Sequence, residues 1–338
     1  MAALVARRGM TLTDNIDDYP EGIILPVDKP YRWTSADVIR KVKYQAIRHF
    51  HKKNLKVGHA GTLDPLATGV LLVCIGKATK LAEELQASPK QYLAGVTFGA
   101  TTPSYDLEKE IDQEFPLDGV NEAALRSVLP GFIGEQDQVA PLFSAKSVDG
   151  VRAYEMARRA YKEAQRSGVS FDHAATELLS RQRINIYSLE LEIFIPTSSG
   201  AGIEPENASL RSAPPIASNG PLPLMLPRVA QFSGPIPAPE TDPGAPASSP
   251  ETDPCAPASE NRTDRNGRIH VADISGYDLP TAMVRVDCSK GTYIRALARD
   301  LGEALGSGAF LSSLRRTRNG GIPVADALSL PDALSLLQ

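Results

Sequence analysis

Cysteine is scarce in this chain of 338 residues. The three cysteines, Cys74, Cys255 and Cys288, lie far apart and show none of the short spacings of a zinc site or a disulfide framework. No apolar run approaches the roughly 20 residues that a membrane-spanning helix needs. The N-terminal segment also lacks the hydrophobic core of a secretion signal. We therefore expect a cytoplasmic protein without disulfides and without membrane association.

Glycine-rich phosphate loops are missing as well. Gly58 and Gly61 lack the spacing and the Lys-Ser/Thr ending of a nucleotide-binding loop, so the sequence indicates neither ATP nor dinucleotide binding. The formal net charge is only −4, which is unusual for a protein that binds nucleic acid. The acids, however, are frequent in the N-terminal arm and in residues 197–270. The rest of the chain is slightly basic, which is compatible with a polarised, nucleic-acid-binding surface.

One carboxylate stands out in residues 56–71, KVGHAGTLDPLATGVL. Asp64 precedes Pro65, and a proline fixes its own φ and favours an extended backbone in the residue before it. The apolar run 70–75 that follows has the pattern of a buried strand. Residues 38–63 carry several Lys and Arg residues but no acid. The sequence thus places a single carboxylate on a stiff loop in basic surroundings, although an ordinary turn beside a solvated basic helix gives the same pattern.

The remaining pattern mixes strands and helices without regular βαβ alternation, which is typical of an α+β fold. We expect strands at 22–27, 70–75, 91–99, 183–195 and 281–288, and an extended segment at 138–145. Helices are expected at 35–48 after a cap at Thr34 or Ser35, at 78–86, 121–129 and 153–167, and after residues 289–295 as far as Leu305.

Composition divides the chain into three parts. Residues 1–21 form an acidic arm that we expect to be disordered. Residues 196–270 are rich in Pro, Ala, Ser and Gly, and PETDPGAPASS at 239–249 recurs as PETDPCAPASE at 250–260. A segment with so few large apolar residues cannot form a core, and we therefore expect a disordered insertion there. Strand patterns on both sides of it indicate that 22–195 and 271–338 form one domain around one interrupted sheet.

Three sequence blocks carry a family resemblance: GHAGTLDPLATGVL, KQYLAGVTFGATTPSYD and CSKGTYIRALARDLGEALGSGAFLSSLRR. They resemble the signature blocks of the TruB family of pseudouridine synthases, over essentially 22–195 and 271–325. The resemblance implies a pseudouridine synthase fold, with one mixed, mostly antiparallel central sheet flanked by helices. It also implies an enzyme without cofactor or metal that flips the T-loop uridine of transfer RNA (tRNA), at position 55, and isomerises it to pseudouridine.

The same resemblance assigns the catalytic residues. Asp64 is implied to be the nucleophile, which attacks the sugar C1′ or assists formation of a glycal-like intermediate. Arg295 is implied to pair with Asp64, which holds the carboxylate ionised and aimed. Tyr92 matches the tyrosine that stacks on the target base and helps to remove the C5 proton.

Further residues are implied to contact the substrate. His59 resembles the histidine that fills the space left by the flipped bases, and Tyr293 and Leu314 resemble residues that line the nucleotide pocket. Lys29 resembles a structural lysine near the active site. Asp106 falls at a motif position whose role, catalytic or structural, the resemblance leaves open.

An RNA-facing region is implied at residues 143–146 and in the basic helix at 153–167. Phosphate contacts from Arg152, Arg158 and Arg159 are expected there. The T-arm of tRNA is the expected partner, and no obligate protein partner is expected.

The sequence differs from the family pattern in two respects, and two alternative functions stay open. The chain beyond Leu314 is too short for the C-terminal RNA-binding domain of many relatives, so we expect none, and 196–270 replaces a short connection. The alternatives are an RNA-guided pseudouridine synthase catalytic subunit, and an RNA-binding or folding module without turnover. The missing C-terminal domain disfavours the first, and the presence of Asp64, Tyr92 and Arg295 disfavours the second.

Overall fold

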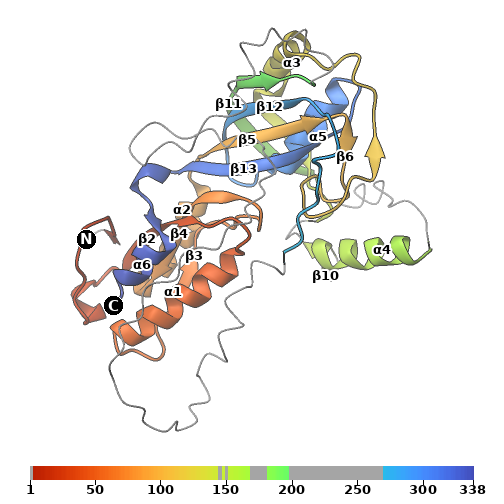
Figure 1. The fold of residues 1–338 in the computed structure, drawn as a ribbon. Coiled ribbons are helices and arrows are strands. Elements are labelled where there is room, and N and C mark those ends of the chain that lie inside the picture. The colour runs from red at the N-terminus through yellow and green to blue at the C-terminus, as the bar shows by residue number, and fades with distance from the viewer. Residues whose placement is uncertain (1–2, 144–146, 149–150, 168–180, 198–268) are drawn as a thin grey trace, which may run out of the picture.

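The computed structural model describes residues 3–143, 147–148, 151–167, 181–197 and 269–338. Its main feature is a long twisted sheet that runs through the molecule (Figure 1), with strand order β1-β2-β4-β13-β5-β12-β11-β8. These strands are β1 (Leu4–Val5), β2 (Ile23–Lys29), β4 (Thr68–Ile75), β13 (Ala309–Asn319), β5 (Lys90–Phe98), β12 (Thr281–Cys288), β11 (Arg181–Ile195) and β8 (Gly134–Val139).

Most neighbours in this sheet are antiparallel, whereas β1 runs parallel to β2 and β4 runs parallel to β13. Short strands extend the sheet: β3 (Val57–His59) pairs with β4, β14 (Ile322–Pro323) with β13, and β15 (Leu328–Ser329) with β2. Two separate ribbons pair β6 (Ala100–Thr101) with β7 (Gln113–Glu114) and β9 (Ser147–Val148) with β10 (Val151–Arg152). The expected α+β fold with one mixed, mostly antiparallel sheet is confirmed.

Helices pack at both ends of the sheet, with one exception. They are α1 (Ser35–His49), α2 (Ala82–Ala87), α3 (Glu122–Val128), α4 (Ala153–Ser167), α5 (Ile294–Ala304) and α6 (Leu330–Ser335). Helices α1 and α6 lie beside the β2–β4 end, where both chain termini also lie, and α3 and α5 lie at the other end (Figure 1). The exception is α4, which lies apart beside β10 (Figure 1). Among the described residues, no helix is both long and apolar enough to cross a membrane.

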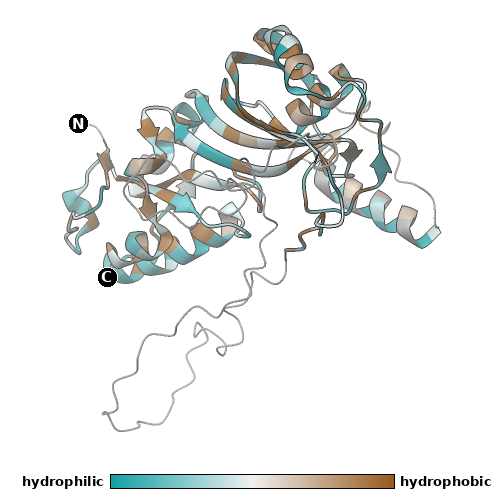
Figure 2. Ribbon diagram, turned by 45° about the horizontal axis from the view of Figure 1, so that its top comes forward, coloured by the Kyte–Doolittle hydropathy of each residue, from teal (hydrophilic) through white to brown (hydrophobic). Residues whose placement is uncertain are grey.

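Helix α1 shows why the local sequence folds as expected. Thr34 caps it, because its side chain accepts from Asp37 N while the Asp37 carboxylate accepts from Thr34 N, a reciprocal capping box. Val38, Val42 and Ala46 follow at helical spacing and are fully buried. The apolar face of α1 therefore covers one end of the sheet, and its lysines and arginines are exposed. Figure 2 shows hydrophobic and hydrophilic residues alternating along this helix.

Most of the other expected elements are present. Helix 153–167 and strand 281–288 have the expected bounds, and the strands expected at 22–27, 70–75, 91–99 and 183–195 differ from the observed ones by no more than two residues at each end. The helix expected at 78–86 begins as a 3₁₀ helix, Gly76–Leu81, before α2. The extended segment expected at 138–145 overlaps only the end of β8 among the described residues.

The two strands that flank residues 196–270 are neighbours in the sheet. Strand β11 pairs antiparallel with β12, from Ile186 opposite Cys288 to Ile195 opposite Thr281. One sheet therefore continues across the long connection, as expected. The expected disorder falls on residues 198–268, which lie outside the described residues. The division into domains stays a prediction.

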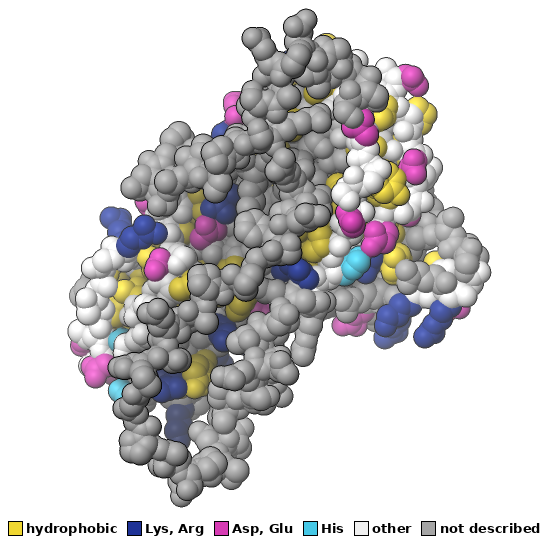
Figure 3. Space-filling model, in the orientation of Figure 1, with side chains coloured by type: hydrophobic (Ala, Val, Ile, Leu, Met, Phe, Trp, Pro, Cys, Tyr) yellow, Lys and Arg dark blue, Asp and Glu magenta, His cyan; other side chains and the backbone are white. Residues whose placement is uncertain are grey.

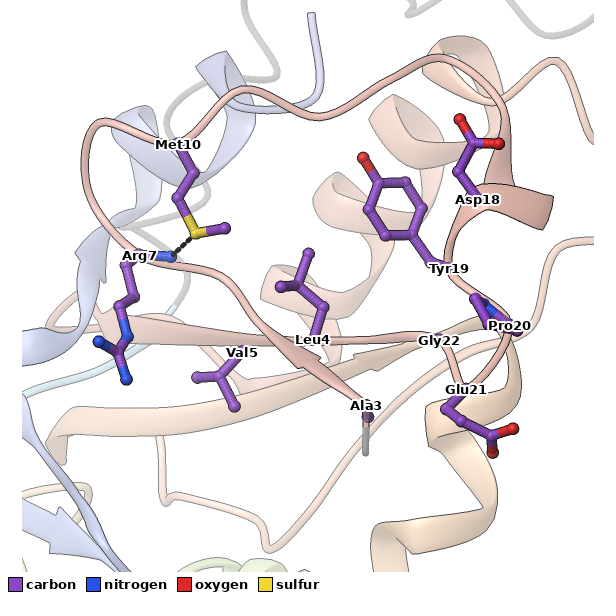
Figure 4. A pocket seen from close by; sticks show the side chains of 10 residues that line it. All are labelled: Ala3, Leu4, Val5, Arg7, Met10, Asp18, Tyr19, Pro20, Glu21 and Gly22. Atoms are coloured by element: carbon purple, nitrogen blue, oxygen red, sulfur yellow. Dashed lines mark hydrogen bonds between the residues drawn. The ribbon is translucent and has the colours of Figure 1, made fainter. Parts of the chain in front are cut away.

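The expectation of a disordered arm over 1–21 is wrong for residues 3–21. Leu4–Val5 adds a strand beside β2, and Ala6, Leu12 and Ile16 are buried in the main core. Figure 4 shows this arm closing around a pocket of about 670 Å³ next to Gly22. The acidic composition was misleading because the acids of residues 14–18 are exposed to solvent while Leu12 and Ile16 are buried.

Strand β13 is the main element that the sequence pattern missed. It lies between β4 and β5 in the middle of the sheet. Its sequence, AFLSSLRRTRN, does not alternate cleanly, because register shifts between Leu311 and Ser313 and between Arg316 and Arg318 change which side chains face the core. Arg316 consequently points into the protein and is 1% exposed.

Candidate active site

The loop that carries Asp64 joins β3 to β4, and hydrogen bonds to Ser35, the first residue of α1, hold it in place. The Ser35 hydroxyl accepts from Leu63 N at 2.9 Å and donates to Leu63 O at 3.1 Å, while Ala67 N donates to Asp64 O at 3.1 Å. At the end of the loop, Gly69 has φ +99°, and a Cβ there would lie 2.2 Å from Arg316 O. Only glycine allows β4 and β13 to approach this closely.

Asp64 forms the expected ion pair with Arg295, the second residue of α5. Arg295 Nε lies 3.0 Å from Asp64 Oδ2, and Nη2 donates to Asp64 Oδ1 at 3.3 Å. Two further guanidinium bonds go to the carbonyls of Ser104 (3.0 Å) and Phe143 (2.8 Å). The Arg295 side chain is 7% exposed and that of Asp64 39%. A buried guanidinium thus holds a carboxylate that is open to solvent on one side.

Two more acids surround Arg295, and we call Arg295, Asp64, Asp106 and Glu108 the Arg295 cluster. Asp106 Oδ2 lies 3.6 Å from Arg295 Nε, and Asp106 Oδ1 accepts from the Ser104 hydroxyl at 2.6 Å. Burial, opposed by Arg295 and reinforced by Asp64, raises the pKa of Asp106. Burial and then Asp106 raise the pKa of Glu108 to about 7. Burial lowers the pKa of Arg295, but the three carboxylates raise it by more, so the guanidinium stays charged.

Lys29, at the end of β2, lies under the Asp64 loop and is fully buried. Its ammonium donates to the carbonyls of Pro30 (3.0 Å), Trp33 (2.5 Å) and Pro65 (3.1 Å). Burial, opposed by the charge of Asp64, lowers the pKa of Lys29 to about 7. Lys29 thus ties the residue after Asp64 to the loop between β2 and α1.

Tyr92 lies on β5, directly opposite Arg316 of β13. It is 9% exposed, and burial raises the pKa of its hydroxyl while Arg316, which also bonds to it, lowers it. Arg316 donates to the carbonyls of Val70 (2.7 Å), Gly61 (3.2 Å) and Thr62 (3.4 Å). Sequence reasoning did not single out Arg316. The only sequence signal is the Arg-Arg pair at the end of the third block, and the bulge that buries its second member cannot be read from it.

The other residues expected to contact the substrate lie on β3, at the start of α5 and on β13. His59 is half-buried on β3, its Nδ1 has no hydrogen-bond partner within the described residues, and burial and then Arg316 lower its pKa. Tyr293 caps α5, and its N–H and carbonyl bond to the Gln138 side chain. Leu314 on β13 packs partly buried against the main core.

The expected RNA-facing region is described in part. Exposed basic residues of α4, Arg159, Lys162 and Arg166, line its outer side, and Figure 3 shows dark blue side chains beside this helix at the lower right. The Phe143 and Tyr161 rings meet edge to face at 6.5 Å, which connects α4 to the Arg295 cluster. Residues 144–146 and the side chains of Arg152 and Arg158 lie outside the described residues.

A second basic surface is formed mainly by residues that precede the Asp64 loop in the sequence. Lys43, Lys53 and Lys56 line a groove of about 520 Å³ that continues to Gly58 and Thr79, and we call it the lysine groove. No acid lines it, and these lysines make no ion pair within the part of the chain that the structure describes. Across the described ranges, no group of three or more His, Cys, Asp or Glu side chains is arranged to hold a metal ion.

Comparison with known proteins decides the family. Residues 48–200 match the model of the TruB family pseudouridylate synthase (N terminal domain). A tRNA pseudouridine synthase B from Phocaeicola vulgatus is 35% identical over 93% of this chain and 92% of its own length, and one from Bacteroides thetaiotaomicron is 36% identical over 92% and 91%. This chain belongs to the TruB family. The expected family and enzyme class, a pseudouridine synthase, are confirmed.

Solved structures show a weaker likeness to this TruB family member. A chain in a Cbf5-Nop10-Gar1 complex aligns with a TM-score of 0.49 at 20% identity, over 98% of this chain and 60% of its own length. The chain described here therefore spans about three-fifths of that protein.

Proposed function

We propose that this TruB family member converts the T-loop uridine of tRNA, at position 55, to pseudouridine, with Asp64 as nucleophile. Relatives that match nearly the whole chain carry the name tRNA pseudouridine synthase B, which supports tRNA as the substrate. The observation that carries the assignment of Asp64 is its geometry: a solvent-accessible carboxylate held through both oxygens by a buried guanidinium.

The reaction is an isomerisation in which one bond is exchanged for another. Asp64 attacks C1′ of the uridine, or assists formation of a glycal-like intermediate, and N1 of the uracil leaves with the electron pair of the glycosidic bond. The uracil turns, C5 bonds to C1′, Asp64 is released, and the C5 proton is lost while N1 gains one. Atoms and electrons balance without any second substrate.

Arg295 serves this reaction by fixing the nucleophile. Four hydrogen bonds, two to Asp64 and two to the carbonyls of Ser104 and Phe143, hold the guanidinium in one orientation. The carboxylate therefore enters the reaction already aimed, which lowers the reorganisation needed in the transition state.

Extrusion of the uridine leaves a gap in the RNA and places the base in the protein. We assign the stacking role on the target base to Tyr92, and the filling of the gap to His59, whose lowered pKa keeps it neutral near pH 7. Tyr293 and Leu314 line the nucleotide pocket in this proposal, and Lys29 supports the Asp64 loop.

The T-arm of the tRNA lies across the basic residues of α4 in this proposal, with phosphate contacts that carry no sequence information. We propose that the protein acts alone and in the cytoplasm, where its substrate is found. The described cysteines, Cys74 and Cys288, are buried free thiols, which fits a reducing compartment.

Mapping of pseudouridine in an unmodified tRNA transcript after incubation with the purified protein tests the proposal. The expected product carries pseudouridine at position 55 and none in a transcript that has cytidine there. Modification at another position contradicts the T-loop assignment. Binding without turnover, or turnover only with an added guide RNA, favours one of the two alternative functions instead.

A further inference from the structure

The loop between β2 and α1, residues 30–33, presents two aromatic residues in opposite ways. Trp33 packs against the main hydrophobic core. Tyr31 points outward and is 46% exposed. Neither residue has been given a role above, and an exposed tyrosine alone carries no information, because single exposed apolar residues are common.

The backbone on both sides of Tyr31 is fixed to the Asp64 loop. One ammonium, Lys29 Nζ, bonds to the carbonyl before Tyr31, at Pro30, and to the carbonyl of Trp33. Its third bond goes to Pro65 O at 3.1 Å, next to the nucleophile. The Tyr31 side chain therefore projects from a backbone segment that Lys29 anchors to the residue after Asp64.

Arg32 fixes the same loop from the other side at a conformational cost. Its φ is 61°, in the left-handed region that is unfavourable for residues with a side chain. Its Nη2 donates to Ile269 O at 2.8 Å, while its buried Nε has no hydrogen-bond partner within the described residues. Strain of this kind persists where the surrounding structure enforces it, and it is concentrated at functional sites.

The Tyr31 hydroxyl lies within electrostatic range of the Arg295 cluster. Partial burial raises the pKa of the Tyr31 hydroxyl, Arg32 lowers it, and the Asp106 carboxylate raises it again. Asp106 in turn lies 3.6 Å from the guanidinium that holds Asp64. An exposed aromatic side chain thus projects from a backbone segment that is anchored to the Asp64 loop.

We propose that Tyr31 is a stacking platform for an unpaired nucleobase of the RNA substrate, next to the uridine that enters the site. RNA loops are recognised through unstacked bases that pack on aromatic side chains. A tyrosine side chain has few rotatable bonds, and here the backbone that carries it is already anchored, so little conformational freedom is lost when a base stacks on it. The inference rests on the proposed function in that it takes a tRNA loop as the substrate.

Equilibrium binding of a tRNA transcript, measured in an Asp64→Asn background to prevent turnover, tests this. Tyr31→Ala should weaken binding roughly tenfold, since base–aromatic stacking contributes about that much or more. Tyr31→Phe should bind as tightly as the parent, because the ring is retained. Tyr187→Ala is the matched control, since Tyr187 on β11 is 51% exposed, and its Kd should not change.

A fluorescence measurement separates stacking from a structural role. Trp33 is the only tryptophan of the chain, so Trp33→Phe combined with Tyr31→Trp leaves one tryptophan, at position 31, which can be excited selectively over the tyrosines. Its emission should be quenched when tRNA binds. Unchanged Kd in Tyr31→Ala, or absence of quenching at saturating tRNA, overturns the inference. Both readouts are independent of where pseudouridine forms, so failure of the T-loop assignment is detected separately.

Discussion

Charges are arranged in opposite ways in the Arg295 cluster and the lysine groove. In the cluster, one buried guanidinium faces three carboxylates and two carbonyls, and every contact is set by elements that are far apart in the sequence. In the groove, three exposed lysines from α1 and the connection that follows it have no acidic partner within the described residues. Buried charges act through fixed geometry, whereas exposed charges act through the field and are screened by salt.

This difference predicts how each region responds to substitution. A change in the cluster should mainly alter the chemical step and stability. A change in the groove should mainly alter the affinity for RNA and its dependence on salt.

After replacement of Asp64 itself, the largest effect is expected for Arg295→Lys. The ammonium keeps the charge but cannot reach both Asp64 oxygens and both carbonyls at once. The single-turnover rate should fall roughly 100-fold, the size of effect typical for loss of a preorganised donor, with little change in the Kd for tRNA. Arg299→Lys, four residues further along α5, is the control and should retain most of the activity. A near-normal rate for Arg295→Lys would show that the paired geometry is not needed.

A smaller loss is expected for Arg316→Lys. Lysine cannot donate to Gly61, Thr62 and Val70 together, so the loop before Asp64 and the neighbouring Tyr92 should lose their fixed positions. We expect kcat to fall roughly tenfold with little change in KM, and a lower thermal midpoint. Arg318→Lys on the same strand, where the arginine side chain is 46% exposed, should change neither. Equal effects of the two substitutions would argue against a positioning role for Arg316.

The next prediction concerns pH and the half-buried acid Glu108. Its pKa rises from about 4.5 in the unfolded chain to about 7, so the folded protein binds more protons between these values. Stability should therefore fall as pH rises through this window, and Glu108→Gln should remove that loss. Denaturant unfolding at pH 5 and pH 8 should show a smaller difference for the variant than for wild type, by on the order of 1 kcal/mol. An unchanged difference would contradict the raised pKa.

The smallest effect is expected in the lysine groove. Replacing Lys43, Lys53 and Lys56 with Gln should weaken tRNA binding, by about twofold to fivefold at moderate salt, and should reduce the slope of log Kd against log salt concentration. The kcat at saturating tRNA should not change. Arg126→Gln on α3 is the control for loss of one surface charge and should leave the slope as it is. A reduced kcat with an unchanged salt slope would show that the lysine groove, like the Arg295 cluster, acts on the chemical step and not on RNA binding.

The sequence predicted those helices and strands whose hydrophobic periodicity agrees with the burial of their residues in the fold. Residues 153–167 and 281–288 have clear periodicity and were found with their observed bounds, and Thr34, one of the two expected cap residues, starts α1. The ion pair of Asp64 with Arg295 was expected through the family resemblance, and the structure contains it. Neither residue has a local pattern that predicts the other.

The missed parts depend on tertiary structure. Strand β13 has two bulges, so a run that looks polar is the centre of the sheet, and Arg316 is buried without a local signal. The N-terminal arm looks disordered because of its acids, although Leu12 and Ile16 are buried. Glu108 belongs to the Arg295 cluster only because α5 packs beside the loop that follows β6. Composition cannot report contacts that other elements create.

The central claim is that Asp64, held by Arg295, is the nucleophile. Asp64→Asn keeps the size and shape of the side chain but removes the charge and most of the nucleophilicity. A single-turnover assay with enzyme in excess over tRNA, together with a Kd measurement, tests the claim directly. The account predicts no detectable pseudouridine and a Kd close to that of wild type. Pseudouridine formation by the purified variant at a rate near that of wild type would contradict it.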